Sequence, residues 1–177
     1  DVSHMLAIDV RGTGARDFLR RSLANNVDRL RAPGRALYSC MLNHAGGVVD
    51  DLIVYFFADK FFRLVVNSGR AAADLAWLES LRERHGAAPE LLPRHELAMI
   101  AVQGPRARER VWQALPKTHA PTQALQSFYA VQLGELTLAR TGYTGEDGFE
   151  LMLPAARAEP LWQQLIGCGV KPCGLGA

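Results

Sequence analysis

The segment from Gly46 to Tyr55 constrains the fold more than any other part of the chain. The adjacent glycines Gly46 and Gly47 predict a hairpin turn, because glycine readily adopts the positive φ that primed turns need. The following residues are mostly β-branched or apolar, as expected for a strand that is at least half buried, except for Asp50 and Asp51. A carboxylate on an apolar strand is costly unless it is solvated, paired or used in chemistry.

Strand geometry limits what these two acids can do. Neighbouring residues of a strand point to opposite faces, so Asp50 and Asp51 cannot both face one pocket and do not form a catalytic carboxylate pair. At most one of them is a working acid, and the alternation alone does not select it. The structural alternative is a hairpin whose acids lie at a solvated strand end, as aspartates near turns commonly do.

Length, charge and cysteine content exclude several classes of protein. The 177 residues suffice for one domain or for two small halves. The net charge is only +2 and the basic residues are dispersed, so no nucleic-acid partner is indicated. No run approaches the roughly 18 apolar residues of a membrane span. An odd count of three cysteines favours reduced, cytoplasmic thiols, and Cys168 and Cys173 lack the further ligands of a zinc site, so no metal is expected.

The order of the predicted elements repeats along the chain. Hydrophobic spacing predicts a strand, a helix, three strands and a helix within residues 5–81, and residues 97–166 show the same order without a repeat at the level of single residues. We therefore predict an α+β fold made of two similar units, residues 1–93 and 94–177, around a cleft. In each half a glycine-rich turn leads to an acid on a strand, Asp51 in the first and Glu150 in the second, which points to a shared site.

The segment from Arg140 to Glu150 is the second unusual stretch. Its three glycines, spaced by three residues, predict a tight backbone, and Tyr143 and Glu150 could point into the cleft. The segment lacks the ending of a phosphate loop and the alternating acids of an EF-hand loop. The structural alternative is a polar loop whose groups are satisfied internally and bind nothing.

Six motifs together resemble one family. They are residues 1–5 (DVSHM), 42–54, 65–67 (VVN), 103–105 (QGP), 141–150 and 171–177 (KPCGLGA). In this order, and over essentially the whole chain, they resemble the T-protein of the glycine cleavage system, a tetrahydrofolate-dependent aminomethyltransferase. The resemblance implies transfer of a methylene group to tetrahydrofolate, as co-substrate, from an aminomethyl group on the lipoyl arm of the H-protein, with release of ammonia.

The resemblance also implies a larger architecture. Family members have three domains with folate held in a central channel, and the two predicted halves would form the first two. The third domain, a small β-barrel, would lie beyond Ala177, and the start of the first domain would precede Asp1. The expected location is the cytoplasm of a bacterium, or the mitochondrial matrix if the source is eukaryotic.

Individual roles follow from the matching motifs. Asp51 is the expected catalytic acid, which would stabilise an iminium-like carbon or relay a proton from N5 of the folate. Glu150 is expected to accept two parallel hydrogen bonds from the 2-amino and N3 edge of the pterin. The other residues expected to line the folate pocket are Tyr38, Ile53, Asn67 and Tyr143. Tyr38 lies on an apolar strand, so an ordinary core position is an equal alternative for it.

Other functions fit the same resemblance. One alternative is the folate-binding domain of a dimethylglycine or sarcosine dehydrogenase, which captures methylene from an amine oxidised elsewhere and carries an upstream flavin domain. Another is a folate-binding regulatory or repair protein of the same fold, but such proteins tend to carry a Lys-Gly-Cys-Tyr motif that this sequence lacks. A non-catalytic fragment is compatible with each of these functions.

Overall fold

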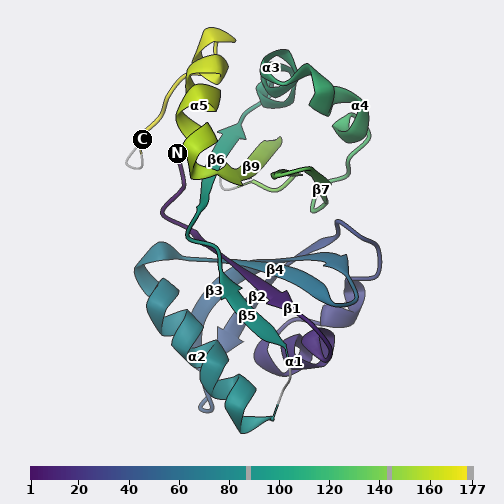
Figure 1. Cartoon of the computed structure of the whole chain (residues 1–177), viewed down its shortest axis with the longest axis vertical. Helices are drawn as coiled ribbons and strands as arrows, with labels where there is room; N and C mark the ends of the chain where they lie inside the picture. The colour runs from purple at the N-terminus through teal and green to yellow at the C-terminus, as the bar shows by residue number, and fades with distance from the viewer. Residues whose placement is uncertain (87–88, 143–144, 175–177) are drawn as a thin grey trace. The chain divides into compact units, whose positions relative to one another are not determined.

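The computed structural model describes residues 1–86, 89–142 and 145–174. It divides into two compact units, one formed by Met5–His95 and the other by Asp1–His4 with Glu96–Ala177. We call them the first and the second unit (Figure 1). Residues 1–4 belong to the second unit because the amide of Val2 (2.9 Å) and the hydroxyl of Ser3 (3.2 Å) both donate to the carbonyl oxygen of Met99.

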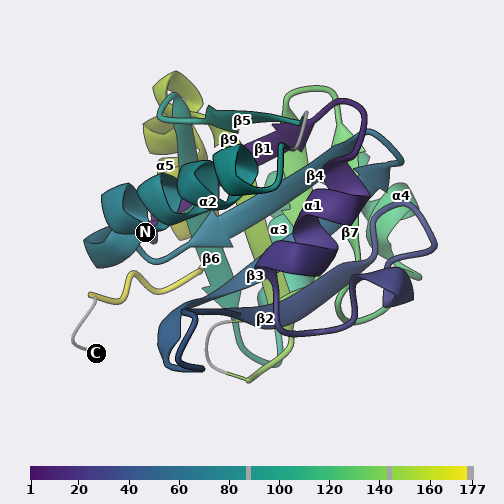
Figure 2. The same ribbon diagram turned by 90° about the horizontal axis from the view of Figure 1, so that it is seen from below.

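The first unit is a five-stranded antiparallel sheet with helices on one face (Figures 1 and 2). Its strand order is β2 (Ala36–Leu42), β3 (Val48–Ala58), β4 (Phe61–Val66), β1 (Leu6–Arg11) and β5 (Glu90–Pro93). The helices are α1 (Ala15–Ser22) and α2 (Ala71–Arg84), and 3₁₀ turns cover Val27–Arg29 and Ser68–Arg70.

Alternating strand residues and helical stripes form the core of the first unit. Phe18 and Leu19 of α1 and Leu78 of α2 pack against Ile8 and Val54 of the sheet, and all five are at most 2% exposed. Each such side chain contributes about 1.5–3 kcal/mol relative to full exposure. The helices therefore cover one face of the sheet and leave the opposite face uncovered.

The second unit is a four-stranded antiparallel sheet that also carries its helices on one face. Its strand order is β6 (Leu97–Gln103), β9 (Gly148–Pro154), β8 (Leu136–Ala139) and β7 (Ala130–Leu133). The helices are α3 (Ala107–Ala114), α4 (His119–Thr122) and α5 (Ala158–Gly167), and 3₁₀ turns cover Pro116–Thr118 and Ala155–Arg157. Val111 of α3 and Leu165 of α5 share a buried cluster with Ile100, Phe149 and Leu151 of the sheet.

The predicted α+β class and the repeated order of elements are confirmed. The first unit runs β1, α1, β2, β3, β4, α2 and the second runs β6, α3, β7, β8, β9, α5. The sheet orders β2-β3-β4-β1 and β7-β8-β9-β6 are equivalent. The four-residue edge strand β5 and the single-turn helix α4 were not predicted, because such short elements show no clear periodicity.

Asp51 and Glu150, each preceded by a glycine-rich segment as predicted, lie on strands that are not equivalent in the two units. Asp51 lies on β3, whereas Glu150 lies on β9, whose counterpart in the first unit is β4. The two glycine-containing segments connect different strand pairs, because residues 43–47 precede β3 and residues 140–147 separate β8 from β9.

The β2–β3 connection is a hairpin, as predicted, but it is not a two-residue glycine turn. The loop spans residues 43–47, and of its two glycines only Gly46 has a positive φ, of 83°. The side-chain oxygen of Asn43 accepts hydrogen bonds from the amides of Ala45 and Gly47, both at 2.9 Å. Asn43 therefore organises the turn, as asparagine does when its side chain bonds to the backbone that follows it.

Gly148 allows β9 to approach β6 closely, and we expect Gly148→Ala to destabilise the second unit. A Cβ at this position would lie 2.1 Å from the carbonyl oxygen of Val102. The expected loss is about 1–3 kcal/mol in the free energy of unfolding, measured by urea denaturation. Gly167→Ala is the control, because a Cβ there meets nothing within 4 Å. Equal midpoints for the two variants would contradict this account of the strand contact.

Candidate functional site

Asp50 and Asp51 lie on opposite faces of β3, as strand alternation predicts. Asp50 is 8% exposed and shares its face with Leu52, which packs in the core with α1 and α2. Asp51 is partly buried on the other face, in register with Cys40 of β2. The two carboxylates therefore work in different surroundings, and only Asp51 is on the face that the helices leave uncovered.

A donor from each of two neighbouring elements holds the carboxylate of Asp51. The hydroxyl of Tyr38 on β2 donates to Oδ2 at 3.0 Å, and Nδ2 of Asn67, just after β4, donates to Oδ1 at 3.3 Å. The hydrogen bond to Asp51, followed by burial, raises the pKa of the Tyr38 phenol, so Tyr38 remains a donor. Tyr38 is 49% exposed, so the alternative of an ordinary core tyrosine is wrong.

Ile53 and Tyr38 flank Asp51 on the same face. Ile53 follows Asp51 by two residues and is in register with Tyr38 across the β2–β3 pair. Ile53 is partly buried and offers an apolar contact beside the carboxylate. The first unit thus brings together four of the residues singled out in the sequence: Tyr38, Asp51, Ile53 and Asn67.

The side-chain amide of Asn67 lies between the two acids of β3. Its Nδ2 is 3.0 Å from Oδ1 of Asp50, 3.1 Å from the backbone oxygen of Asp51 and 3.3 Å from Oδ1 of Asp51. Its backbone amide also donates to Oδ2 of Asp50 at 3.3 Å. The side chain of Asn67 therefore contacts an acid on each face of the sheet, Asp50 on the helix-covered face and Asp51 on the opposite face.

Asp74, in the first turn of α2, adds a third carboxyl that sequence analysis missed. It is 0% exposed, and burial followed by the hydrogen bond and the charge of Asp50 raises its pKa to about 7, against a lowering by Arg70. Burial also raises the pKa of Asp50, but hydrogen bonds from Asp74 and Asn67 outweigh it and leave that pKa below its ordinary value. Below about pH 7 the proton of this pair therefore resides on Asp74.

Glu150 in the second unit is an acid with a different environment. It is 7% exposed, lies on β9, and accepts a hydrogen bond from the hydroxyl of Thr141. Its register neighbours are Ala101 on β6 and Ala139 on β8, which place little bulk beside the carboxylate. The adjacent residue Phe149 belongs to the helix-side core, so Glu150 points to the opposite face of its sheet.

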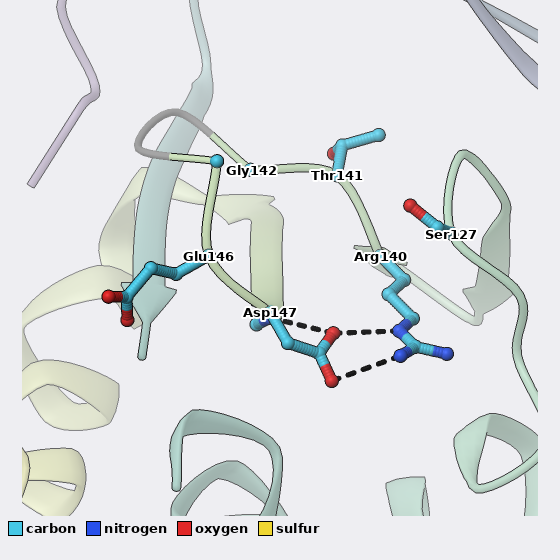
Figure 3. A pocket seen from close by; sticks show the side chains of 8 residues that line it. Ser127, Arg140, Thr141, Gly142, Glu146 and Asp147 are labelled. Atoms are coloured by element: carbon cyan, nitrogen blue, oxygen red, sulfur yellow. Dashed lines mark hydrogen bonds and ion pairs between the residues drawn. The ribbon is translucent and has the colours of Figure 1, made fainter. Parts of the chain in front are cut away.

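The loop before Glu150 is closed by an ion pair (Figure 3). Nε and Nη2 of Arg140 donate to the two oxygens of Asp147 at 2.7 and 3.0 Å, and Nη1 donates to the carbonyl oxygen of Leu125 at 2.8 Å. The hydrogen bond from Arg140 holds the pKa of Asp147 below its usual range. A polar pocket of about 200 Å³ lies along this loop, lined by Thr141 and Glu146 among others. The sequence analysis did not predict this ion pair, although Arg140 and Asp147 carry opposite charges at the two ends of this loop.

One predicted site residue, Tyr143, lies outside the residues that the structure describes. Its expected place in the folate pocket therefore stays a prediction.

Within the described ranges, no group of three or more His, Cys, Asp or Glu side chains is arranged to hold a metal ion. Among these same residues, no helix combines the length and the apolar character needed to cross a membrane.

Comparison with known proteins gives consistent matches. A family model described as the GCVT N-terminal domain matches residues 1–177. An aminomethyltransferase of Burkholderia multivorans is 53% identical over 182 residues, which cover 100% of this chain and 49% of that protein. An aminomethyltransferase of Nitrosomonas europaea is 52% identical over 177 residues, with the same coverage. The chain thus spans about half the length of the curated relatives it matches.

Solved structures show the same fold. The crystal structure of glycine cleavage system aminomethyltransferase T from Bartonella henselae has a TM-score of 0.83 and 34% identity, and the match covers 94% of this chain and 44% of that one. A heterotetrameric sarcosine oxidase from Corynebacterium sp. U-96 has a TM-score of 0.61 over 98% of this chain and 84% of that one. Its identity is 14%, so this second likeness concerns the fold alone.

Proposed function

The chain belongs to the GCVT N-terminal domain family, and from this premise we propose that the full-length protein is an aminomethyltransferase of the glycine cleavage system. Its substrates are tetrahydrofolate and the aminomethylated lipoyl arm of the H-protein. The methylene carbon loses its bonds to nitrogen and to sulfur and gains bonds to N5 and N10 of the folate. The two protons displaced from N5 and N10 balance the ammonia and the free thiol of the carrier.

The observation that carries this proposal is the placement of Asp51. Its carboxylate lies on the open face of the first unit's sheet, with one neutral donor on each oxygen, Tyr38 and Asn67. These donors hold the carboxylate in place without cancelling its charge. Departure of ammonia leaves positive charge on the methylene carbon, and a fixed negative charge aimed at that carbon stabilises the transition state. We therefore assign Asp51 an electrostatic role in preference to proton transfer from N5.

Glu150 is the proposed acceptor for the pterin. A carboxylate can take two parallel hydrogen bonds from the 2-amino and N3 edge, and alanines on both neighbouring strands leave room beside it. The hydroxyl of Thr141 orients one of its oxygens, and the Arg140–Asp147 pair closes the loop that carries Thr141. Tyr38, Ile53, Asn67 and Tyr143 complete the proposed folate-binding set.

The remaining features of the whole protein are proposals of the same kind. We propose the lipoylated H-protein and tetrahydrofolate as partners of the full-length protein. A cytoplasmic location and a reaction without a metal stay predictions from the sequence.

We expect Asp51→Asn to separate binding from turnover. The amide keeps the size of the side chain but loses the charge, so kcat should fall by about 10²–10³-fold while the Kd for tetrahydrofolate changes by less than about threefold. Rates of ammonia release and calorimetry on the full-length protein measure the two effects. Asp59→Asn, in the exposed turn between β3 and β4, removes the same charge and serves as the control. Unchanged turnover in Asp51→Asn would remove this residue from the reaction.

We expect Glu150→Gln to weaken folate binding. The neutral amide loses one charge-assisted hydrogen bond to the pterin edge, which corresponds to a rise in Kd of roughly 10–100-fold. Calorimetric titration with tetrahydrofolate measures this effect. Glu135→Gln, in the exposed turn between β7 and β8, is the matched control. If the affinity of Glu150→Gln equals that of the control, Glu150 does not contact the pterin.

A further inference from the structure

We propose that Asp74 is a positioning residue for Asp51: its protonated carboxyl donates a hydrogen bond to Asp50, which fixes Asn67 and, through Asn67, the carboxylate of Asp51. The proposal rests on the proposed function in one respect, which is that Asp51 acts on the reacting carbon. The sharing of a proton between Asp74 and Asp50 does not depend on that function.

The first step is the burial of Asp74 against another acid. Asp74 is 0% exposed, and within the described part of the chain neither of its oxygens has a hydrogen-bond donor when it is ionised. A buried carboxylate without a donor is costly, and a second carboxylate facing it adds repulsion. One proton removes both penalties, because a protonated Asp74 becomes a donor to Asp50. The raised pKa of Asp74, about 7, agrees with this arrangement.

The charged groups around Asp74 leave Asp50 as its partner. Asp50 projects from β3 on the helix-covered face of the sheet, and its charge favours the protonated form of Asp74. Arg70, exposed just before α2, acts in the opposite direction, and its effect is the smaller one. The partial positive charge at the start of α2 also favours an ionised Asp74. Burial and Asp50 together outweigh these two influences.

The second step is the link from Asp50 to Asp51. Asp50 accepts from both Nδ2 (3.0 Å) and the backbone amide (3.3 Å) of Asn67. Because an ionised Asp50 can only accept, these contacts require Asn67 to present its NH₂ group, which is also 3.3 Å from Oδ1 of Asp51. A fixed Asp50 thus fixes the orientation of Asn67, and Asn67 fixes one oxygen of Asp51.

Loss of the proton from Asp74 should disturb this chain of contacts. Two ionised carboxylates would then repel each other behind β3, and Asp50 would move relative to Asn67. The orientation of the Asp51 side chain would then be less well defined. A displaced carboxylate stabilises the transition state less, while substrate contacts elsewhere persist, so we expect kcat to change more than KM.

The stability of the protein provides a test of the shared proton that does not involve activity. An unfolded Asp releases its proton near pH 4, whereas folded Asp74 retains it to about pH 7. Between these values the folded state binds the extra proton, so the contribution of Asp74 to stability falls as the pH rises through this window and then levels off. Asp74→Asn has no such proton, and its amide can donate to Asp50 at every pH.

The experiment compares Asp74→Asn and Asp74→Leu with the wild type in the full-length protein, with Glu79→Gln on α2 as the control. We expect the Tm of Asp74→Asn, relative to that of the wild type, to rise between about pH 4 and pH 7 and then to level off, whereas Glu79→Gln parallels the wild type. We also expect Asp74→Asn to retain kcat within about threefold at neutral pH and to lack the wild-type loss of kcat above about pH 7. Asp74→Leu should lose kcat about tenfold or more with little change in KM.

Several outcomes would overturn the proposal. Parallel Tm curves for Asp74→Asn and the wild type would show that Asp74 holds no proton in the folded state. A folded Asp74→Leu with wild-type kcat would remove the positioning role, and if that variant does not fold, an alkaline loss of kcat that persists in Asp74→Asn does the same. A wild-type protein that releases no ammonia would overturn the proposed function and the positioning role together, whereas the Tm curves would still report the proton.

Discussion

The hydrogen bonds made by the side-chain amide of Asn67 are the interaction on which the rest of the site depends. They occur where β4 ends beside the start of β3, and they reach an acid on each face of the sheet. Without this amide, Asp50 would lose a donor to Oδ1, and Asp51 would keep the contact from Tyr38 to Oδ2 but lose the one to Oδ1. A single neutral side chain thus donates to two adjacent carboxyl groups at the edge of a hydrophobic core.

Both units use the same general design, although their acids occupy different strands. Each sheet packs its helices and its main apolar cluster on one face, and the helices leave the other face uncovered. Asp51 and Glu150 lie on these other faces, the first partly exposed and held by two neutral donors, the second nearly buried. The difference in burial is consistent with the two proposed roles. Stabilising a charge requires that Asp51 can approach the reacting carbon, whereas the hydrogen bonds from Glu150 to the pterin are stronger where water is excluded.

Much of this arrangement could be predicted from the sequence, and the failures have physical causes. The apolar run after Asp51 and the helical spacing of Phe18 and Leu19 are local patterns, so the elements and their order were predictable. Alternation showed that Asp50 and Asp51 face opposite ways, but only the packing of α2 decides which face is covered. Asp74 resembles an ordinary acid in the first turn of a helix, and its burial against Asp50 is a contact between distant segments that no local pattern encodes.

The most direct test of this account measures ammonia release from an aminomethylated lipoyl H-protein by the full-length protein, with and without tetrahydrofolate. We expect tetrahydrofolate to accelerate ammonia release and 5,10-methylenetetrahydrofolate to form in equal amount, because one carbon moves for each ammonia released. Ammonia release at the same rate in both conditions, or without formation of the folate product, would contradict the assignment of this sheet face to folate-dependent aminomethyl transfer.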